Sequence, residues 1–412
     1  FFEVLLAASY GLLLHGDGTT RVRAGLHYVA VNLLASLLFL IGVALLYGIT
    51  GTLNMADIAS KLPHIPDADR GLLHAAAALL GVAFLTKAAF WPLGFWLPPA
   101  YAAASAPSAG MFAILTKVGV YAVLRLWALC FPGTGGGAGL FGNPVLLWGG
   151  MATLAFGAVG MLGSAQLGRL GGYAIIMSSG TVLAAISLNQ PAISGGALLY
   201  LASSTLAVAA LFLLAELVER SRHAEVDPPS PDDMDGRLPT FGEAPSRRDV
   251  NLDDDQVALI GRPIPAAPPF LALAFLVCTV VLAGVAPLSG FVGNLAMLLG
   301  LLDERAATPE AWPQAGWAFF FLLIASGFLA ATALMRAFIT HFWSLQDRAA
   351  PHLRMAEGVP VALLLGACVG LAVAGEGAMG YMRAAAGHLH SPQHYIAAVK
   401  AARPVESPKA VP

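Results

Sequence analysis

Long apolar runs separated by short polar segments set the pattern of this chain of 412 residues. A helix that crosses a bilayer needs about 20 consecutive, mostly apolar residues. Apolar runs that we expect to form helices occur at residues 1–14, 24–48, 71–98, 106–131, 146–164, 171–190, 194–218, 268–303, 315–345 and 358–382. The pattern therefore predicts an all-α integral membrane protein with one transmembrane helix for each of these runs.

Two of the runs are longer than a single span needs, and each contains a helix-breaking residue. Pro92 interrupts the run at 71–98, and Pro287 and Gly290 interrupt the run at 268–303. In lipid, a broken helix is tolerated only where protein or water satisfies the freed backbone groups. Two interrupted segments far apart in the sequence point to a transport site. We therefore predict two broken helices that serve such a site.

Two other segments are too polar to lie in a membrane. Residues 219–265 are rich in Pro, Asp, Arg and Gly, which is typical of a solvated loop, and residues 385–412 form a polar tail. The transmembrane helices then fall in 1–218 and 266–384. The membrane face that carries residues 219–265 has eleven Lys and Arg residues, against eight on the other face. This bias puts the long loop in the cytoplasm and the C-terminus outside.

The composition agrees with a membrane protein and argues against several functions. Hydrophobic residues make up 58% of the chain and charged residues only 11%, whereas soluble domains carry about 25% charged residues. A net charge of −2 argues against a nucleic-acid partner. The three cysteines stand singly, so we expect no metal site, cofactor or disulfide framework. We also find no nucleophile–base pair or phosphate loop, which favours a transporter over an enzyme.

Two lysines are placed where a charge is costly. Lys87 and Lys117 lie inside apolar runs, and a lysine at the centre of a membrane-spanning helix costs roughly 2.5–3.5 kcal/mol on insertion scales. A lysine so deep usually faces a water-filled interior, and once desolvated it releases its proton readily. Arg336, near the end of another run, is predicted to extend toward the lipid headgroups instead. Lys87 and Lys117 are therefore our candidates for proton transfer.

Other residues in the first half of the chain complete this hypothesis. Glu3 is an acid inside the first apolar run, and Lys87 and Lys117 are the cations deep enough to pair with it. His74 is a weaker candidate for the relay, because it lies nearer the start of its helix, where a histidine is more often a cap or faces a loop. Since Pro92 has no N–H, we expect the carbonyl beside Lys87 to lack its helical donor and to hold water.

The motifs around these lysines resemble a known family. The stretch TKAAFWPLGFWLPPAYAAASAPSAGMFAILTKVGVYAVLR is similar to the core signature of the antiporter-like membrane subunits. Such subunits occur in respiratory complex I, in membrane-bound hydrogenases and in Mrp-type (Pha-type) cation/proton antiporters. The variants LPPAY and TKVGVY look most like the D-type subunit of the Mrp antiporters. Further matches, including LGRLGGYAIIMSSGTVLAAI and APLSGFVGN, extend the resemblance along nearly the whole chain.

The resemblance implies a fold of fourteen helices that contains two inverted repeats, each with one broken helix. Residues 1–218 would then hold helices five to eleven of that fold, and residues 266–384 helices twelve to fourteen. We therefore expect that the first four helices of the natural protein are absent from this sequence. The resemblance also implies that Glu3 and Lys87 form a charge pair, and that Lys87 exchanges a proton through water with Lys117.

Two positions depart from the family pattern. Ser203 stands where the family usually has a histidine, and Asn294 stands where it usually has a lysine. Neither residue titrates near neutral pH. Either Ser203, Ser204, Thr205 and Asn294 order water that carries protons onward, or this half of the chain does not translocate them.

The sequence thus leaves three hypotheses about function. The first is a proton-translocating subunit of a multi-subunit Na⁺ or K⁺/H⁺ antiporter, in a hetero-oligomer with other Mrp-type subunits in a bacterial plasma membrane. The second is a proton-pumping subunit of a redox complex of the complex I or hydrogenase type. The third is a scaffold subunit that has lost transport.

Overall fold

The computed structural model describes residues 2–15, 18–131, 142–223, 267–307, 314–343 and 353–401, with the backbone alone at 2–3, 221–223, 305–307 and 343. All elements within these ranges are helical. The α-helices are α1 (Phe2–Leu14), α2 (Thr19–Thr50), α3 (Met55–Lys61), α4 (Asp67–Lys87), α5 (Leu97–Ala103), α6 (Ala106–Cys130), α7 (Asn143–Gly163), α8 (Leu167–Ser187), α9 (Pro191–His223), α10 (Ala267–Ala283), α11 (Ser289–Ala307), α12 (Gln314–Phe338), α13 (Met355–Val373), α14 (Gly375–His390) and α15 (Gln393–Ala401). Short turns of other helix types are η1 (Leu62–His64), η2 (Leu93–Trp96) and the π-helical η4 (Ile339–Trp343).

The predicted fold class is confirmed. Each apolar run of the sequence contains at least one helix, and the run at 358–382 is divided between α13 and α14 at Ala374. Within the described residues eight helices are long and apolar enough to cross a membrane. Two shorter apolar helices lie at Val4–Leu14 and Ala267–Ala283. The chain is therefore a multi-pass membrane protein.

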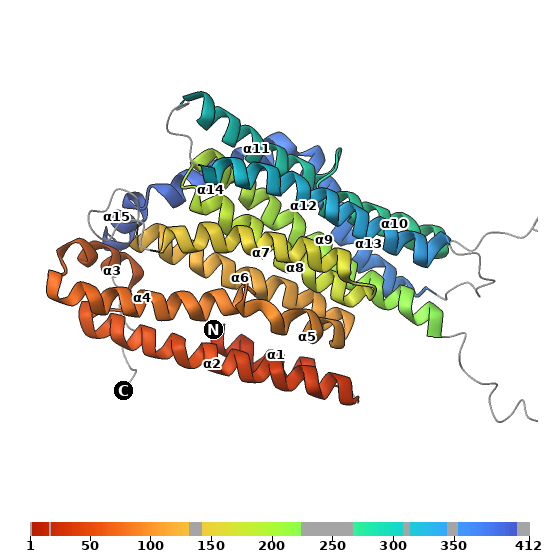
Figure 1. Ribbon diagram of the computed structural model, residues 1–412, viewed down its shortest axis with the longest axis horizontal. Helices are drawn as coiled ribbons and strands as arrows, with labels where there is room; N and C mark the ends of the chain where they lie inside the picture. The colour runs from red at the N-terminus through yellow and green to blue at the C-terminus, as the bar shows by residue number, and fades with distance from the viewer. Residues whose placement is uncertain are drawn as a thin grey trace, which may run out of the picture.

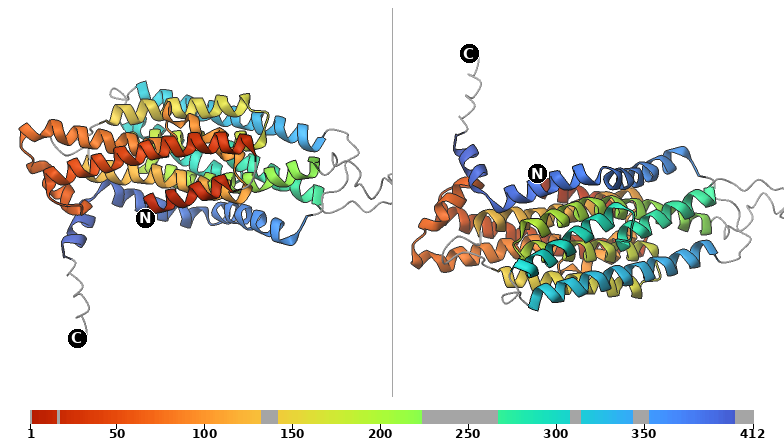
Figure 2. Two further views of the ribbon diagram at one scale, coloured as in Figure 1. Left: turned by 90° about the horizontal axis from the view of Figure 1, so that it is seen from below. Right: turned by 90° about the horizontal axis from the view of Figure 1, so that it is seen from above.

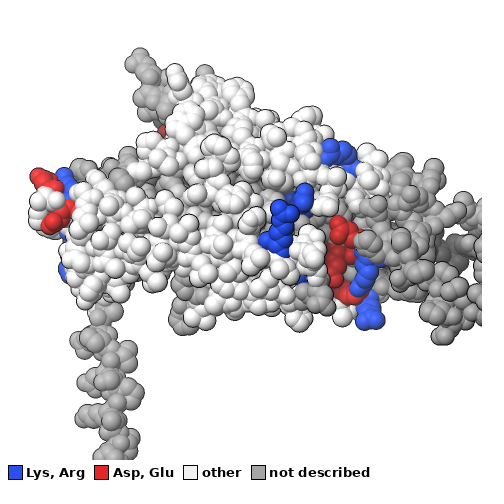
Figure 3. All heavy atoms as spheres, turned by 60° about the horizontal axis from the view of Figure 1, so that its bottom comes forward, with Lys and Arg blue, Asp and Glu red and all other residues white. Residues whose placement is uncertain are grey.

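The helices lie side by side in an elongated bundle (Figures 1 and 2). Figure 1 places α1, α2 and α4 on one side of the bundle, α10, α11 and α12 on the other, and α7, α8 and α9 between them. Figure 3 shows acidic and basic side chains toward the two ends of one face, with a broad uncharged band between them. This distribution of charge is expected of a bundle whose middle lies in hydrocarbon.

The central helix α8 is almost wholly buried, and small residues allow its close contact with α7. A Cβ atom built on Gly157 of α7 would come within 2.3 Å of the Met177 backbone nitrogen. A Cβ atom on Gly180 of α8 would come equally close to the Leu154 nitrogen. Membrane helices pack by such close backbone approach, because lipid supplies no hydrophobic force between them. The two glycines thus fix the position of α8 in the core.

The first broken helix ends in a left-handed turn. Ala89 has a φ of 57°. The Phe90 N–H donates to the Leu85 carbonyl at 3.0 Å, and the Ala89 N–H donates to the Thr86 carbonyl at 3.1 Å. These paired bonds are a Schellman motif, which satisfies the last carbonyls of a helix.

The second broken helix ends in the same way. Gly284 has a φ of 67°. The Val285 N–H donates to the Val280 carbonyl at 3.0 Å, and the Gly284 N–H donates to the Val281 carbonyl at 3.2 Å. Two segments far apart in the sequence therefore end their first half-helix with the same hydrogen bonds, as expected of repeated units.

The position of the first break differs in one respect from the prediction. The sequence attributes the free carbonyl beside Lys87 to Pro92. In the structure α4 has already ended at Lys87, and Ala88 is its C-cap. The Ala88 carbonyl therefore lies outside the helix whatever residue stands at position 92, because the left-handed turn comes first.

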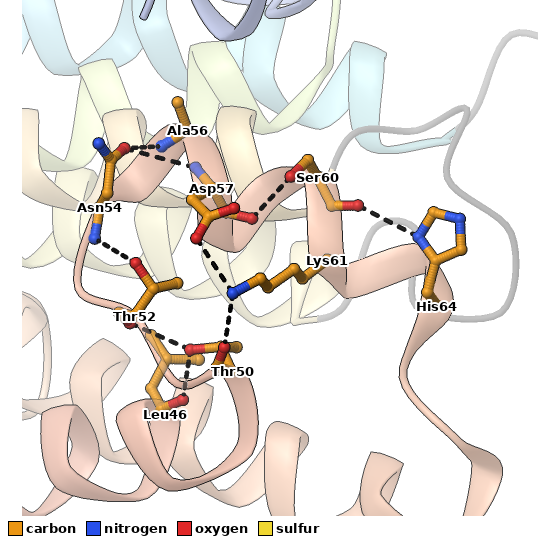
Figure 4. A network of polar contacts seen from close by, with 9 residues as sticks. All are labelled: Leu46, Thr50, Thr52, Asn54, Ala56, Asp57, Ser60, Lys61 and His64. Carbon is orange, nitrogen blue, oxygen red and sulfur yellow. Dashed lines mark hydrogen bonds and ion pairs between the residues drawn. The ribbon is translucent and has the colours of Figure 1, made fainter. Parts of the chain in front are cut away.

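A polar network joins the end of α2 to the short helix α3, which the apolar pattern did not predict (Figure 4). Asn54 caps α3, since its Oδ1 accepts from the Ala56 N–H at 3.0 Å. Lys61 lies 3.1 Å from Asp57 and donates to the Thr50 carbonyl at 3.0 Å. The lysine thus satisfies a carbonyl that α2 leaves free at its C-terminus.

The two polar segments are described only in part. α9 continues to His223, and the rest of the predicted loop at 219–265 lies outside the described residues. The predicted tail at 385–412 begins inside α14 and includes α15, and its residues 402–412 also lie outside the description. α15 packs against α3, and Tyr395 covers the guanidinium of Arg125 at 4.0 Å, a cation–π contact.

Candidate functional site

Lys87 is the last residue of α4 and is buried, with a relative exposure of 5%. Its Nζ donates to Ser36 Oγ of α2 at 3.3 Å. The break next to it is covered by aromatic rings: Trp96 donates to the Thr86 carbonyl at 3.2 Å and lies edge-on to Tyr28. The rings exclude lipid from the break, so Lys87 faces protein rather than hydrocarbon.

A small cavity adjoins the Lys87 side chain. Its lining residues come from several helices and are Leu6, Tyr28, Asn32, Lys87, Trp96, Tyr101, Leu115 and Thr116. The cavity has a volume of about 10 Å³, which is about the least space that admits one water molecule. Tyr101 and Thr116 hydrogen-bond to each other at 2.6 Å in its wall. A single water in this cavity would lie between the Lys87 ammonium and the hydroxyl groups of Tyr101 on α5 and Thr116 on α6.

Lys117 lies near the middle of α6 and is also buried, with a relative exposure of 6%. Its Nζ donates to Ser178 Oγ, to Ser179 Oγ at 3.2 Å and to the Ile175 carbonyl at 3.5 Å, all on α8. Within the part of the chain that the structure describes, Lys117 forms no ion pair. Neutral acceptors hold the ammonium without fixing its charge, so this lysine can release and regain a proton.

α6 separates the two lysines. Thr116 and Lys117 are neighbours in sequence and point about 100° apart around the helix, since an α-helix has 3.6 residues per turn. Thr116 lines the cavity beside Lys87, whereas Lys117 reaches α8. A Cβ atom on Gly119 would come within 2.9 Å of the Ala88 nitrogen, so α6 passes directly against the break. The structure thus brings Lys87 and Lys117 to the two sides of one helix.

The remaining predicted residues of the first half are placed differently. Glu3 lies in the first turn of α1, and its side chain is outside the described residues. The predicted pairing of Glu3 with Lys87 therefore stays a prediction. His74 is half-buried in α4 and lies thirteen positions before Lys87, which corresponds to about 20 Å along the helix. The structure does not bring His74 to the two lysines.

In the second half, Ser203 of α9 reaches the second broken helix. Its hydroxyl hydrogen-bonds to that of Ser289, the first residue of α11, at 2.7 Å. Ser204 and Thr205 instead donate to the Leu201 carbonyl of their own helix, at 3.2 and 2.6 Å. Of Ser203, Ser204 and Thr205, Ser203 is the one whose hydroxyl contacts the second break. Its partner, Ser289, lies two positions after Pro287.

Asn294 is the sixth residue of α11, near Gly290 in sequence. Its Oδ1 is buried and accepts no hydrogen bond from the residues that the structure describes. A Cβ atom on Gly284 would come within 2.0 Å of Asn294 Nδ2, so the amide lies against the left-handed turn. A buried acceptor without a protein donor is a place where an ordered water is expected.

The sequence reasoning missed the groups on α8 that join the two halves. Ser178 and Ser179 bind Lys117, and Thr181 hydrogen-bonds to the buried hydroxyl of Tyr200 on α9. These three α8 residues and Tyr200 share one signal that could have identified them. Each is a polar residue inside an apolar run, and three of them stand together in MSSGT.

Comparisons with known proteins agree with this architecture. Residues 1–235 match the family described as NADH:quinone oxidoreductase/Mrp antiporter, TM. The chain is 49% identical over 393 residues to the D-type subunit of the probable K⁺/H⁺ antiporter of Rhizobium meliloti (strain 1021), covering 95% of this chain and 71% of that protein. It is 31% identical over 404 residues to the D-type subunit of the Na⁺/H⁺ antiporter of Bacillus subtilis (strain 168), covering 97% and 72%.

A solved structure supports the fold independently. The chain superposes on a chain of the Mrp complex from Dietzia sp. DQ12-45-1b with a TM-score of 0.75, covering 97% of this chain and 74% of that one at 24% sequence identity. The family match spans more than half of the sequence. This chain belongs to the NADH:quinone oxidoreductase/Mrp antiporter transmembrane family.

Proposed function

We propose that this chain is the D-type subunit of a multi-subunit cation/proton antiporter in a bacterial plasma membrane, and that protons cross the membrane through it. The names of its relatives as K⁺/H⁺ and Na⁺/H⁺ antiporter subunits support this proposal. Its partners would be the other subunits of an Mrp-type complex, and the exchanged cation K⁺ or Na⁺. The loop at 219–265 would face the cytoplasm.

The observation that carries the proposal is the environment of Lys117. The Lys117 ammonium donates to hydroxyl and carbonyl oxygens, which offset part of the cost of burying its charge. No carboxylate among the described residues holds it in the charged form, so its burial favours loss of the proton. Such a group is therefore better suited to transferring a proton than to stabilising the folded protein.

Lys87 and Lys117 would be the central proton-carrying groups of the route. When Glu3 approaches Lys87, the carboxylate favours the ammonium form, and when Glu3 withdraws, the amine can release its proton. Water in the small cavity and the hydroxyl of Thr116 would carry that proton around α6 to Lys117. Ser178 and Ser179 then lead toward Thr181 and the second half of the bundle.

The second half would work through water rather than through titrating side chains. Asn294 offers a buried acceptor, and Ser203 and Ser289 form a hydroxyl pair at the second break. These groups support a water relay more than they support a scaffold, because a buried acceptor left without a donor costs about 1–3 kcal/mol. A subunit that only held its neighbours together would gain stability by replacing Asn294 with an apolar residue.

The test is cation-driven proton movement in vesicles that contain the complete antiporter. Lys87→Ala and Glu3→Ala should each lower exchange by at least about tenfold, since general acid–base groups typically contribute 10²–10⁴-fold to proton transfer. Lys61→Ala is the matched control, because Lys61 lies in the exposed network at the end of α2 and should leave exchange unchanged. Wild-type exchange in Lys87→Ala would contradict the proposal.

The family also includes subunits of NADH:quinone oxidoreductase, so a redox complex is the alternative. Both functions would use the lysines in the same way. The subunits that co-purify with this chain separate them: small antiporter subunits support our proposal, and proteins that carry redox centres support the alternative.

A further inference from the structure

A second and larger cavity lies between α6, α7, α8, α9 and α14, at the end of the bundle where α9 begins. Its volume is about 220 Å³, which is enough for several water molecules at about 30 Å³ each. Apolar side chains form most of its wall. The polar residues that line it are Asn143, Ser187, Asn189 and His390.

The cavity continues the α6–α8 interface that holds Lys117. On α6, Leu124 and Ala128 follow Lys117 at seven and eleven positions, on the same face of the helix, and both line the cavity. On α8, Ser187 follows Ser179 at eight positions, again on one face. The seven residues from Lys117 to Leu124 correspond to about 10 Å along the helix. The cavity thus begins about two turns from Lys117, on the side away from the long loop.

His390, the last residue of α14, is hydrogen-bonded at both ring nitrogens. Nε2 lies 2.8 Å from the buried Ser194 hydroxyl, and Nδ1 lies 3.2 Å from Asn189 Oδ1. The Ser194 hydroxyl can donate to a neutral imidazole or accept from an imidazolium, because a hydroxyl does both. The ring can therefore gain or lose a proton at Nε2 without breaking its contacts.

Other charged and titratable groups lie on the helices at this end of the bundle. They are Arg125 of α6, Glu304 of α11, Arg383 and His388 of α14, and His394 of α15. Glu304 accepts from Gln190 at 3.1 Å, and Arg125 lies under Tyr395. Among the described residues none of them forms an ion pair with His390. Burial therefore dominates and lowers the pKa of His390 below its ordinary value.

We propose that this cavity is the outer, water-filled mouth of the proton route, and that His390 is the group that exchanges protons with the external water. The imidazole takes up a proton from external water and releases it to water in the cavity, and water would carry the proton past Val123, Leu124 and Leu183 to Lys117. This inference rests on the proposed function, since it assigns the external end of the same route.

A histidine that only fastens α14 to the start of α9 would have the same contacts. The two roles differ in their dependence on pH. His390→Gln keeps a side chain that can hydrogen-bond to Ser194 and Asn189 but cannot titrate. A purely structural role would therefore leave the pH profile of exchange unchanged in this variant.

The first experiment measures exchange by the complete antiporter in vesicles as a function of external pH. We expect the wild type to show an inflection below about 6.5, the ordinary histidine pKa, and His390→Gln to lose it. His388→Gln is the matched control, because His388 is exposed on the same helix and should keep the wild-type profile. An unchanged profile in His390→Gln would overturn the proposal.

The second experiment tests the mouth itself and does not depend on transport. Ala128→Cys is made in a background in which Cys130, Cys278 and Cys368 are serine, and intact vesicles or cells are treated with a membrane-impermeant maleimide. Labelling from the external side is expected, and labelling from the cytoplasmic side alone, or none, would contradict an outer mouth. The two proposals can fail separately. If the antiporter with Lys117→Met exchanged cations for protons at the wild-type rate while Ala128→Cys was labelled from outside, the proposed function would be wrong, but the cavity would still open to the external side.

Discussion

Lys61 and Lys117 have opposite surroundings. Lys61 is partly exposed and bridges the Asp57 carboxylate and a helix-end carbonyl (Figure 4), so its charge serves local structure. Lys117 is buried against two serine hydroxyls and a carbonyl. An ion pair at the surface adds little to stability, whereas a buried charge without a counter-ion is costly and is retained for a function. Burial and partners thus separate a lysine that stabilises local structure from one that we propose for proton transfer.

The Asp57 contact predicts a pH dependence at this end of the bundle. The hydrogen bond from Lys61 lowers the pKa of Asp57. The folded pKa is thus below the unfolded one, so the contribution to stability is present above about pH 3.9, the ordinary aspartate value, and is lost as pH falls through the folded pKa. Asp57→Asn should lower the protection of the α3 amides against hydrogen exchange, relative to their intrinsic rates, at neutral pH, and should remove the loss of protection on acidification. Asp69→Asn in α4 is the control, and unaltered exchange in Asp57→Asn would refute this account.

At the scale of elements, the sequence indicated the long helices and both breaks, because apolar length and proline are local signals. It did not indicate α3, and it assigned the end of α14 and all of α15 to a polar tail. These helices are short or of mixed polarity, and contacts such as Arg125 with Tyr395 hold α15 in place. It also missed Ser178 and Ser179 as partners of Lys117, because the pairing depends on how α6 and α8 pack.

The two Schellman motifs make a prediction about stability. Ala89 adopts the left-handed conformation that Gly284 adopts in the other break, and this conformation is strained for a residue with a Cβ. Ala89→Gly removes this strain, worth about 1–2 kcal/mol, but it adds freedom to the unfolded chain (about 0.4–1 kcal/mol) and removes a fully buried methyl group (about 0.8 kcal/mol). We therefore expect the free energy of unfolding to change by less than about 1 kcal/mol. Thermal unfolding in detergent measures the change.

Gly284→Ala is the matched variant, and it should lower the unfolding temperature. It adds the same strain and also a contact with Asn294 Nδ2. Equal unfolding temperatures for the wild type and both variants would show that the left-handed turns do not limit stability.

At the scale of the whole molecule, the bundle has two broken helices with unlike chemistry. The first carries Lys87, and the second carries Asn294 and Ser289, which hydrogen-bonds to Ser203 of α9. The burial of Lys87 and Lys117 could be predicted from the sequence, because a lysine in an apolar run is conspicuous. The burial of the Asn294 amide could not, since it depends on how α11 packs against the left-handed turn at Gly284.

Asn294→Leu tests whether the second half carries protons. The substitution removes a buried acceptor that lacks a donor among the described residues, and we expect unfolding stability to be unchanged or higher by about 1–3 kcal/mol. Exchange by the complete antiporter should nevertheless fall. Full exchange in a stable Asn294→Leu variant would support a second half that does not translocate.

The central claim is that Lys117 cycles a proton during exchange. The most direct measurement is cation-driven proton movement in vesicles that contain the complete antiporter with Lys117→Met, an apolar side chain of similar length. The account predicts that the complex assembles and that exchange falls by at least about a hundredfold, within the range for loss of an acid–base group. Exchange at the wild-type rate by an assembled Lys117→Met complex would contradict it.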